Sequence, residues 1–197
     1  MADNIFPTMS FITLENRIKA YKQKPFVVWL MGLSGAGKTT LAYHLEQRLF
    51  SEGYYVATID GDNVRSGLCK DLGFSQEDRT ENLRRVAEMV KLFLQTGVIC
   101  ITSFITPKQF DRDMIKNIIG KDYVVDVYLQ CSVQECAKRD PKQLYHLAKN
   151  KKIANFSGIS SKFEEPVAPA LIVNTEKDII EHNISDIYLY LKTHNFL

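Results

Sequence analysis

The sequence has little of what marks membrane, secreted or nucleic-acid-binding chains. Its apolar runs fall far short of the roughly 20 residues that a membrane-spanning helix needs. The first residues, MADNIFPTMSFITLENR, lack a basic start followed by an apolar stretch, so we expect no secretory signal. The net charge is only +2, which gives no reason to expect a nucleic acid or a membrane surface as partner. We expect a soluble cytoplasmic protein.

Cysteine is also scarce, and its four occurrences follow no metal-binding or redox spacing. Cys69, Cys100, Cys131 and Cys136 form no C-x-x-C pair, and no histidine cluster lies beside them. Cys100 and Cys131 fall in apolar runs typical of strands. We therefore expect buried, reduced thiols. Disulfides or a zinc site are the alternatives.

The composition is that of an ordinary globular protein, with 45% hydrophobic and 24% charged residues. The 197 residues are enough for one domain with a substantial core, and neither internal repeats nor low-complexity tracts occur. Short apolar runs alternate with amphipathic stretches of helical spacing. The runs expected to be strands are 26–31, 54–59, 98–104, 123–129 and 171–173.

The stretches between these runs carry helical patterns. Leu41, Leu45 and Leu49 recur at helical spacing, and Ser75 with Asp78 resembles a capping box before a second helix. Further helices are expected at 111–119, 133–139 and 179–191. Alternating strands and helices predict an α/β fold with a parallel sheet and helices on both faces. Strands that are apolar throughout fit such a buried sheet.

The segment from about 140 to 169 breaks the alternation. It is basic at first (KQLYHLAKNKK) and then contains glycine and serine (NFSGISSKFEEP). We interpret it as a mobile lid rather than a second domain. The expected organisation is an N-terminal extension at 1–24 and a single domain at 25–197.

Residues 32–39 match the pattern G-x-x-x-x-G-K-[ST] between an expected strand and an expected helix. Glycines let the backbone curl so that its N–H groups face phosphate oxygens, and the helix N-terminus adds partial positive charge. Lys38 would reach the β- and γ-phosphates, and the Thr39 hydroxyl could bind Mg²⁺. The alternative is a glycine-rich turn with a chance lysine.

Two carboxylates, Asp60 and Asp62, follow the second expected strand in IDGDNVRSG. Ligands of open α/β sheets bind beyond the carboxyl ends of strands. Carboxylates at this place suggest contacts to the Mg²⁺ shell and a base for an attacking hydroxyl. The alternative is a turn in which the aspartates bond the local backbone.

A third candidate lies in DLGFSQEDRTENLRR, where Arg79 and Asn82 share a helix face three residues apart. Phe74 precedes them, and Arg65 comes shortly before. An aromatic ring, two guanidinium groups and an amide could hold a planar base and an anion. The alternative is a solvated helix face with ordinary charges.

Together these stretches resemble one family. GLSGAGKTT, DGDNVRSGL, LGFSQEDRTENLRRVAEMVKLF, ITSFITP, RDPKQLY and NFSGI…FEEP occur in the order and spacing of the adenylyl-sulfate kinase (APS kinase) family. The resemblance covers about 27–171, and LGFSQEDRTENLRR is its most specific part. It implies a P-loop kinase fold with a five-stranded parallel sheet. It also implies that MgATP phosphorylates the ribose 3′-hydroxyl of adenosine 5′-phosphosulfate (APS), giving 3′-phosphoadenosine 5′-phosphosulfate (PAPS).

The resemblance also implies the roles of single residues. Lys38, Asp60, Asp62 and Thr106 would be catalytic, and Thr39 and Asp60 would lie at the Mg²⁺ ion. ATP would bind Gly35, Ala36, Gly37, Lys38, Thr39 and Thr40 through its phosphates and Arg139 through its adenine. APS would bind Asp62, Asn63, Arg65, Phe74, Arg79, Asn82, Ile105, Thr106, Lys142 and Phe156, with Phe74 and Phe156 flanking the purine.

The sequence departs from the family pattern at several positions. Thr106 replaces the serine of FISP, which is often described as a phosphoenzyme intermediate, and we expect direct in-line transfer instead. Gln143 replaces the glycine of KGLY. Lys149 stands where an arginine is usual, and Ala154 often is a lysine, so the lid has fewer cations.

Partners and alternative functions complete the expectations. The expected partners are the small molecules ATP and APS, with a homodimer and a separate ATP sulfurylase as possible protein partners. The chain alone leaves open whether PAPS serves sulfate reduction or sulfation. One alternative function is a P-loop kinase for another nucleotide-like anion. Another is a catalytically silent nucleotide-binding subunit.

Overall fold

A five-stranded sheet forms the centre of the protein, with the strand order β2-β3-β1-β4-β5. The computed structural model describes residues 6, 8 and 10–197. All neighbouring strands are parallel, so every connection crosses over the sheet. The expected α/β class with a five-stranded parallel sheet is confirmed. The strands are β1 (Val27–Met31), β2 (Val56–Asp60), β3 (Ile99–Phe104), β4 (Val124–Gln130) and β5 (Leu171–Asn174).

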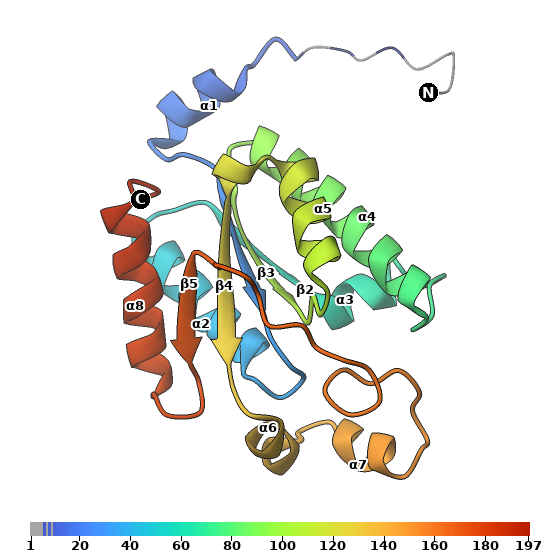
Figure 1. Ribbon diagram of the computed structural model, residues 1–197. Coiled ribbons are helices and arrows are strands. Elements are labelled where there is room, and N and C mark those ends of the chain that lie inside the picture. Colours follow the sequence, from blue (N-terminus) through green and yellow to red (C-terminus); the bar gives the residue numbers. More distant parts are fainter. Residues whose placement is uncertain (1–5, 7, 9) are drawn as a thin grey trace.

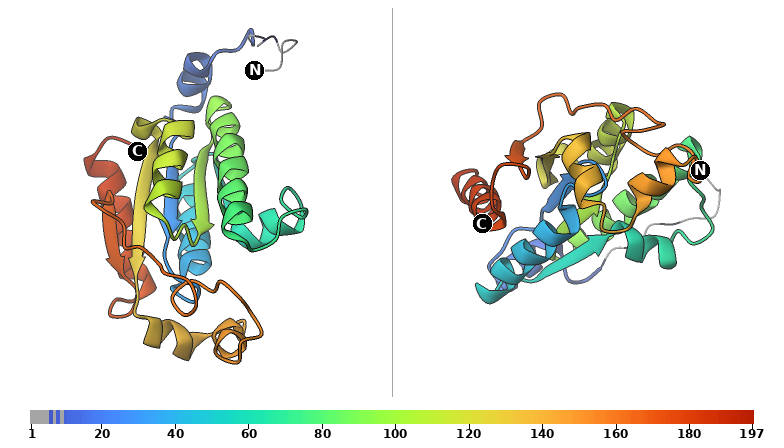
Figure 2. Two further views of the ribbon diagram at one scale, coloured as in Figure 1. Left: turned by 45° about the vertical axis from the view of Figure 1, so that its right-hand side comes forward. Right: turned by 90° about the horizontal axis from the view of Figure 1, so that it is seen from below.

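Helices cover both faces of this sheet (Figure 1). On one face, Val28 and Leu30 of β1 pack in a core with α2 (Lys38–Ser51) and α8 (Ile180–Thr193). On the other face, Trp29 and its neighbours in β1 pack with α4 (Gln76–Gln95) and α5 (Gln109–Ile119). Figure 2 shows the sheet between these two layers. Because alternate residues of a strand point to opposite faces, a fully apolar β1 serves both cores.

Three short helices were not predicted from the sequence. They are α1 (Leu14–Tyr21), α3 (Gly61–Ser66) and α7 (Leu144–Lys149). The helix α6 (Val133–Arg139) has the predicted bounds, and a 3₁₀ turn, Lys121–Tyr123, precedes β4. Ser75 caps α4 by accepting a hydrogen bond from the backbone of Asp78, as predicted. All four cysteines are buried, which confirms the predicted burial.

The described part of the N-terminal extension is attached to one end of the sheet. The buried Gln23 amide donates hydrogen bonds to the carbonyl oxygens of Tyr55 (3.0 Å) and Gly97 (2.8 Å). The ring of Tyr21, the last residue of α1, lies 4.7 Å from the ring of Tyr55. Residues 1–5, 7 and 9 of the predicted extension lie outside the described residues. The division between extension and domain stays a prediction.

The segment predicted to be a lid lies beyond the carboxyl ends of the strands, at the bottom of Figure 1. Apart from α7 it consists mostly of turns and bends. Its backbone turns at four non-glycine residues with positive φ, which are Gln143, Lys151, Asn155 and Ala168. Its mobility stays a prediction. Within the described residues, no helix combines the length and apolar character needed to cross a bilayer.

Candidate active site

The phosphate loop between β1 and α2 has the backbone that its glycines allow. Gly35 has φ +78°, and a Cβ atom there would lie 2.9 Å from the carbonyl oxygen of Cys136. Gly37 has φ +89° and forms the N-cap of α2. The first N–H groups of that helix have no partner within it, and they point toward the loop. Gly32 donates a hydrogen bond of 3.3 Å to the carbonyl oxygen of Ile105, which joins the loop to the end of β3.

Lys38 lies inside the phosphate loop. Its Nζ donates hydrogen bonds to the carbonyl oxygens of Gly32 (3.0 Å) and Leu33 (2.8 Å), and its exposed fraction is 9%. Burial lowers the pKa of Lys38 to about 8, although nearby Asp60 opposes the shift. A bound phosphate would favour the charged form again. The lysine is thus placed to neutralise an anion held by the loop.

Asp60, at the end of β2, bonds the local backbone and also faces the phosphate loop. One carboxylate oxygen accepts hydrogen bonds from the hydroxyl groups of Thr39 (2.8 Å) and Ser103 (2.9 Å). The other accepts the backbone N–H of Asp62 at 2.9 Å and caps α3. Ser103 was not predicted as a site residue. It lies opposite Asp60 in the register of β2 and β3, which the sequence alone does not give.

The oxygen atoms around Asp60 suit a Mg²⁺ ion that is held mainly by nucleotide phosphates. Mg²⁺ prefers hard oxygen ligands and commonly binds one or two protein groups plus phosphates and waters. Thr39 and Asp60 supply a hydroxyl and a carboxylate 2.8 Å apart. Among the described residues, no group of three or more His, Cys, Asp or Glu side chains could hold a metal by itself.

Asp62 and the lid meet across the site. Asp62 lies in the first turn of α3 and is exposed, as is its neighbour Asn63. The Asp62 carboxylate forms an ion pair with Nζ of Lys142, a lid residue 80 positions later in the sequence. Two residues that the resemblance assigns to APS binding are therefore in contact.

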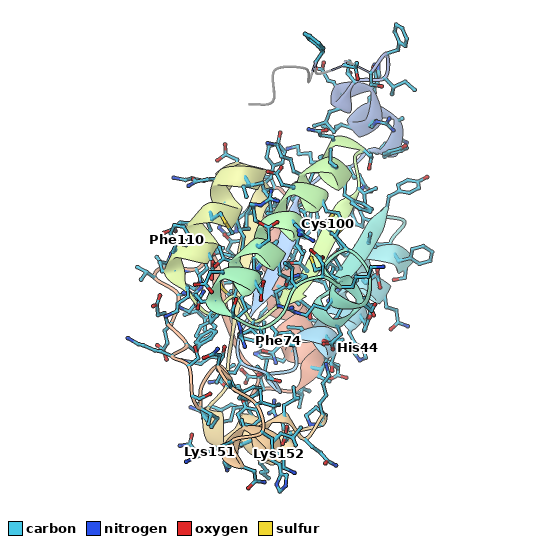
Figure 3. The ribbon with its side chains drawn as sticks, turned by 90° about the vertical axis from the view of Figure 1, so that its right-hand side faces the viewer. His44, Phe74, Cys100, Phe110, Lys151 and Lys152 are labelled. Atoms are coloured by element: carbon cyan, nitrogen blue, oxygen red, sulfur yellow. The ribbon has the colours of Figure 1, made fainter. Side chains whose placement is uncertain are left out.

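Phe74 lies beside two guanidinium groups. The guanidinium carbon of Arg65 is 4.5 Å from the centre of the Phe74 ring, and that of Arg79 is 5.8 Å away. The ring is 61% exposed, and Figure 3 shows it above the lid end marked by Lys151 and Lys152. Burial, and then the neighbouring Arg65, lower the pKa of Arg79 from its ordinary value. Two adjacent cations beside an exposed ring fit an anion attached to a planar base.

Arg79 also contacts the lid, and Asn82 has an unused donor. The Arg79 guanidinium donates to the carbonyl oxygen of Asn155 (2.8 Å) and to the hydroxyl of Ser157 (3.3 Å). Asn82, one turn further along α4, is buried, and its Nδ2 has no hydrogen-bond partner among the described residues. An unpaired buried donor is unfavourable unless a ligand completes it.

Two predicted site residues point away from this cluster. The Phe156 ring is 6% exposed and packs edge-on to Tyr145, with ring centres 4.9 Å apart. The Thr106 side chain is buried, and its hydroxyl accepts a hydrogen bond of 2.9 Å from the indole of Trp29. The structure therefore does not place Phe156 opposite Phe74. It directs the Thr106 hydroxyl into the core.

A second group of contacts surrounds the outer side of the phosphate loop. Arg139, at the end of α6, pairs with Glu135 (3.0 Å) and donates to the carbonyl oxygen of Thr175 (2.7 Å). The Thr175 hydroxyl donates to the carbonyl oxygen of Ala36 at 2.9 Å. Thr175 was not predicted, since a single threonine after a strand carries no distinctive pattern. Arg139 thus lies beside the loop, while the exposed Thr40 is in the first turn of α2.

Comparison with known proteins identifies close relatives. A family model described as adenylylsulphate kinase matches residues 24–174. The adenylyl-sulfate kinase of Clostridium acetobutylicum is 49% identical over 186 residues, which cover 94% of this chain and 92% of that protein. The Mycobacterium tuberculosis APS kinase CysC, solved in complex with AMPPNP and APS, matches with a TM-score of 0.83 at 32% identity, over 86% of this chain and 99% of that one.

An oligomeric relative is also similar. The hexameric APS kinase from Thiobacillus denitrificans matches with a TM-score of 0.68 at 27% identity, over 93% of this chain and 32% of that one. Together with the parallel sheet and the phosphate loop, these matches confirm the P-loop kinase fold predicted from the sequence.

Proposed function

The chain belongs to the adenylylsulphate kinase family, and we propose that it transfers the γ-phosphoryl group of ATP to the 3′-hydroxyl of APS, giving PAPS. One observation carries this proposal: a complete phosphate loop and a separate cationic aromatic cluster share one edge of the sheet. The cluster consists of Arg65, Phe74 and Arg79. A kinase for an uncharged acceptor would have no use for two guanidinium groups there.

The donor site lies at the phosphate loop. Backbone N–H groups of Gly35, Ala36, Gly37 and the start of α2 would bind the β- and γ-phosphates, with Lys38 neutralising their charge. Phosphoryl transfer needs little covalent participation from the protein, so positioning and charge neutralisation supply the catalysis. Arg139, beside the loop through Thr175, would contact the adenine.

A Mg²⁺ ion belongs to this proposal, held by the Thr39 hydroxyl and by Asp60, directly or through water. When bound, it would offset charge on the β- and γ-phosphates. The hydrogen bonds that now join Thr39, Asp60 and Ser103 keep these oxygens together at the end of β2. Ser103 therefore orients Asp60 without itself needing to touch the nucleotide.

The acceptor site lies under the lid. Arg65, Arg79 and Phe74 would hold APS, and Asn82 would donate its free N–H to it. The pocket would be completed by Asn63, Ile105, Phe156 and the backbone of Thr106, whose hydroxyl is engaged by Trp29. Asp62 would accept the proton of the 3′-hydroxyl. Its ion pair with Lys142 would link this base to the lid. The purine would need a shift of the lid to reach Phe156, so the proposal requires that residues 140–169 move.

The wider setting is also a proposal. Four buried free thiols suit a reducing compartment, and we place the reaction in the cytoplasm. A homodimer is our proposal for the assembled state. A separate ATP sulfurylase is the reaction partner that chemistry suggests, because APS must be formed from sulfate and ATP before it can be phosphorylated.

A panel of acceptors tests the proposed function. The protein is incubated with MgATP and, separately, with APS, AMP or gluconate, and ADP formation is followed in each reaction. We expect kcat/KM for APS to exceed that for AMP and for gluconate by at least about tenfold. AMP lacks the sulfate and gluconate lacks both the sulfate and the planar base, and one missing contact to a charged group costs about 1.5–3 kcal/mol. Faster turnover with another acceptor would assign the cationic cluster to a different substrate.

A further inference from the structure

Arg112, in the first turn of α5, joins two loops. One is the loop after β3, which contains Thr106, and the other is the segment of the lid that contains Glu164. The Arg112 side chain is 4% exposed. Nε donates a hydrogen bond of 3.1 Å to the carbonyl oxygen of Thr106, and Nη2 donates to the carbonyl oxygen of Glu164. We infer that Arg112 is a positioning residue for the acceptor site. Its side chain connects the loop that contains Thr106 to the segment by which the lid returns to the sheet. This return segment comprises residues 163–170.

The return segment is anchored at the same place by its own backbone. The N–H of Glu164 donates to the carbonyl oxygen of Pro107 at 2.9 Å. In the opposite direction, the N–H of Gln109 donates to the Glu164 carboxylate at 2.9 Å. Lys108 forms an ion pair with the same carboxylate at 3.3 Å. The lid is therefore attached to the loop after β3, in addition to its connection along the chain to β5.

Aromatic packing adds a second layer to this anchor. The Phe163 ring stacks on Tyr128 with ring centres 6.0 Å apart, and the guanidinium carbon of Arg112 lies 5.4 Å from the Phe163 ring. Arg112 thus touches the return segment through both a hydrogen bond and a ring face. Losing its guanidinium would loosen both contacts at once.

The other end of the connection is a strained residue. Thr106 has φ +46°, and this left-handed region is unusual and strained for a β-branched residue. Such a conformation persists only where the surroundings enforce it. Arg112 holds the carbonyl oxygen of Thr106, and Trp29 holds its hydroxyl. The preceding Ile105 accepts from Gly32 of the phosphate loop, so this strained loop lies between donor and acceptor sites.

The hydrogen bonds of Arg112 indicate that it holds two loops in position, rather than forming a simple ion pair. Its third donor, Nη1, reaches the side-chain oxygen of Gln109 at 3.1 Å, so its three described acceptors are all neutral. Within the described residues Arg112 forms no salt bridge, and burial lowers its pKa from the ordinary value. The carboxylates of Glu164, Asp126 and Asp111 lie near enough to oppose this shift, but the guanidinium donates its described hydrogen bonds to other groups. Its planar fork reaches two loops simultaneously, which a lysine cannot do.

The inference rests on the proposed function, and its test has one arm that does not. The ligand-free wild type, Arg112→Lys and Arg112→Met are compared by hydrogen exchange, and their Michaelis constants for ATP and APS are measured. Arg112→Lys keeps the charge and most of the aliphatic chain, so it stays informative where Arg112→Met fails to fold. The matched control is Arg48→Met, since the Arg48 guanidinium also stacks on a ring, 3.6 Å from the centre of Tyr188.

We expect both Arg112 variants to exchange the amides of 163–170 about tenfold faster, and to raise the KM for APS about tenfold, a change of about 1.4 kcal/mol. The kcat and the KM for ATP should stay within about twofold of wild type, and Arg48→Met should change neither readout. Unchanged exchange at 163–170, or equal increases in both Michaelis constants, would overturn the inference. A wild type that forms no PAPS would contradict the proposed function alone, because the exchange arm still decides whether Arg112 joins the loops.

Discussion

The indole N–H of Trp29 donates a hydrogen bond of 2.9 Å to the hydroxyl of Thr106, and both side chains are buried. This contact fixes the Thr106 oxygen toward the core of the α4 and α5 face, where Trp29 packs. A residue that accepted and released a phosphoryl group would need to rotate between donor and acceptor, and threonine is stiff at χ1. The arrangement supports direct transfer between the two nucleotides.

Thr106→Ala should therefore keep measurable turnover. The loss should correspond to about one hydrogen bond, roughly 0.5–1.5 kcal/mol, and Thr106→Ser should be close to wild type because it keeps the acceptor for Trp29. Steady-state PAPS formation measures both, and mass spectrometry of the wild type with ATP alone looks for a covalent phosphate. A stoichiometric phosphothreonine that passes to PAPS, with an inactive Thr106→Ala, would show a covalent route.

Lys38 should make ATP binding depend on pH. Its pKa in the nucleotide-free protein is lowered to about 8 by burial, whereas bound phosphates favour the protonated form and raise it again. ATP affinity should thus be greatest below about pH 8 and should fall as the pH rises through that value. Titration calorimetry from pH 7 to 9.5 measures the change.

Lys38→Met is the control for that pH dependence. It should bind ATP weakly at every pH with no inflection near 8, and its turnover should fall by about a hundredfold or more. The fold should survive, since removing a desolvated cation removes an unfavourable burial. An inflection of unchanged size in Lys38→Met would assign the titration to another group.

Arg79 and Asn82 should act on the acceptor more than on ATP. Each of the substitutions Arg79→Ala and Asn82→Ala should raise the KM for APS by about ten- to a hundredfold, as expected for one hydrogen bond to a charged ligand. The KM for ATP should change by less than about twofold. Arg84→Ala is the matched control, because Arg84 is on the same helix but pairs with Glu81 at 2.7 Å. A larger effect on ATP would mean that the two nucleotide sites are exchanged.

The left-handed backbone conformation of Gln143 should lower the local stability of α7 in the lid. Gln143 has φ +56° at the N-cap of α7, where the family pattern has glycine, and a left-handed conformation costs a non-glycine residue about 1–2 kcal/mol. Gln143→Gly should slow hydrogen exchange across α7 by about threefold after the entropy of the added glycine is subtracted. Gln143→Ala keeps the strain and should show no slowing. Faster exchange in Gln143→Gly would mean that the Gln143 side chain stabilises the lid.

The sequence predicted the parts of the site that depend on local spacing. The glycines around Lys38 specify a loop whatever the rest of the chain does, and fully apolar strands specified a buried parallel sheet. Residue spacing does not tell which side of the sheet each helix covers. It also does not tell which residue of a neighbouring strand lies opposite the end of a given strand. For this reason Ser103, which meets Asp60 only through the register of β2 and β3, was missed.

Long-range contacts explain the other differences. Trp29 and Thr106 are 77 residues apart, and Phe156 meets Tyr145 only because α7 forms within the predicted lid. The helix α1 was missed although Thr13 and Asn16 form a capping box. None of its residues is buried, so it adds nothing to the core pattern from which the other helices were predicted. Arg112 carried no pattern at all, and its contacts with both loops depend on the folded lid.

The most direct test of the account is the identity of the phosphorylated product. ATP labelled in the γ-phosphoryl group is incubated with the protein, Mg²⁺ and APS, with Lys38→Met as the control, and the product is analysed by mass spectrometry and phosphorus NMR. The account predicts that the label appears on the ribose 3′-oxygen of PAPS, and that the control forms this product at least about a hundredfold more slowly. Label found only in inorganic phosphate, or on another atom of the acceptor, would contradict it.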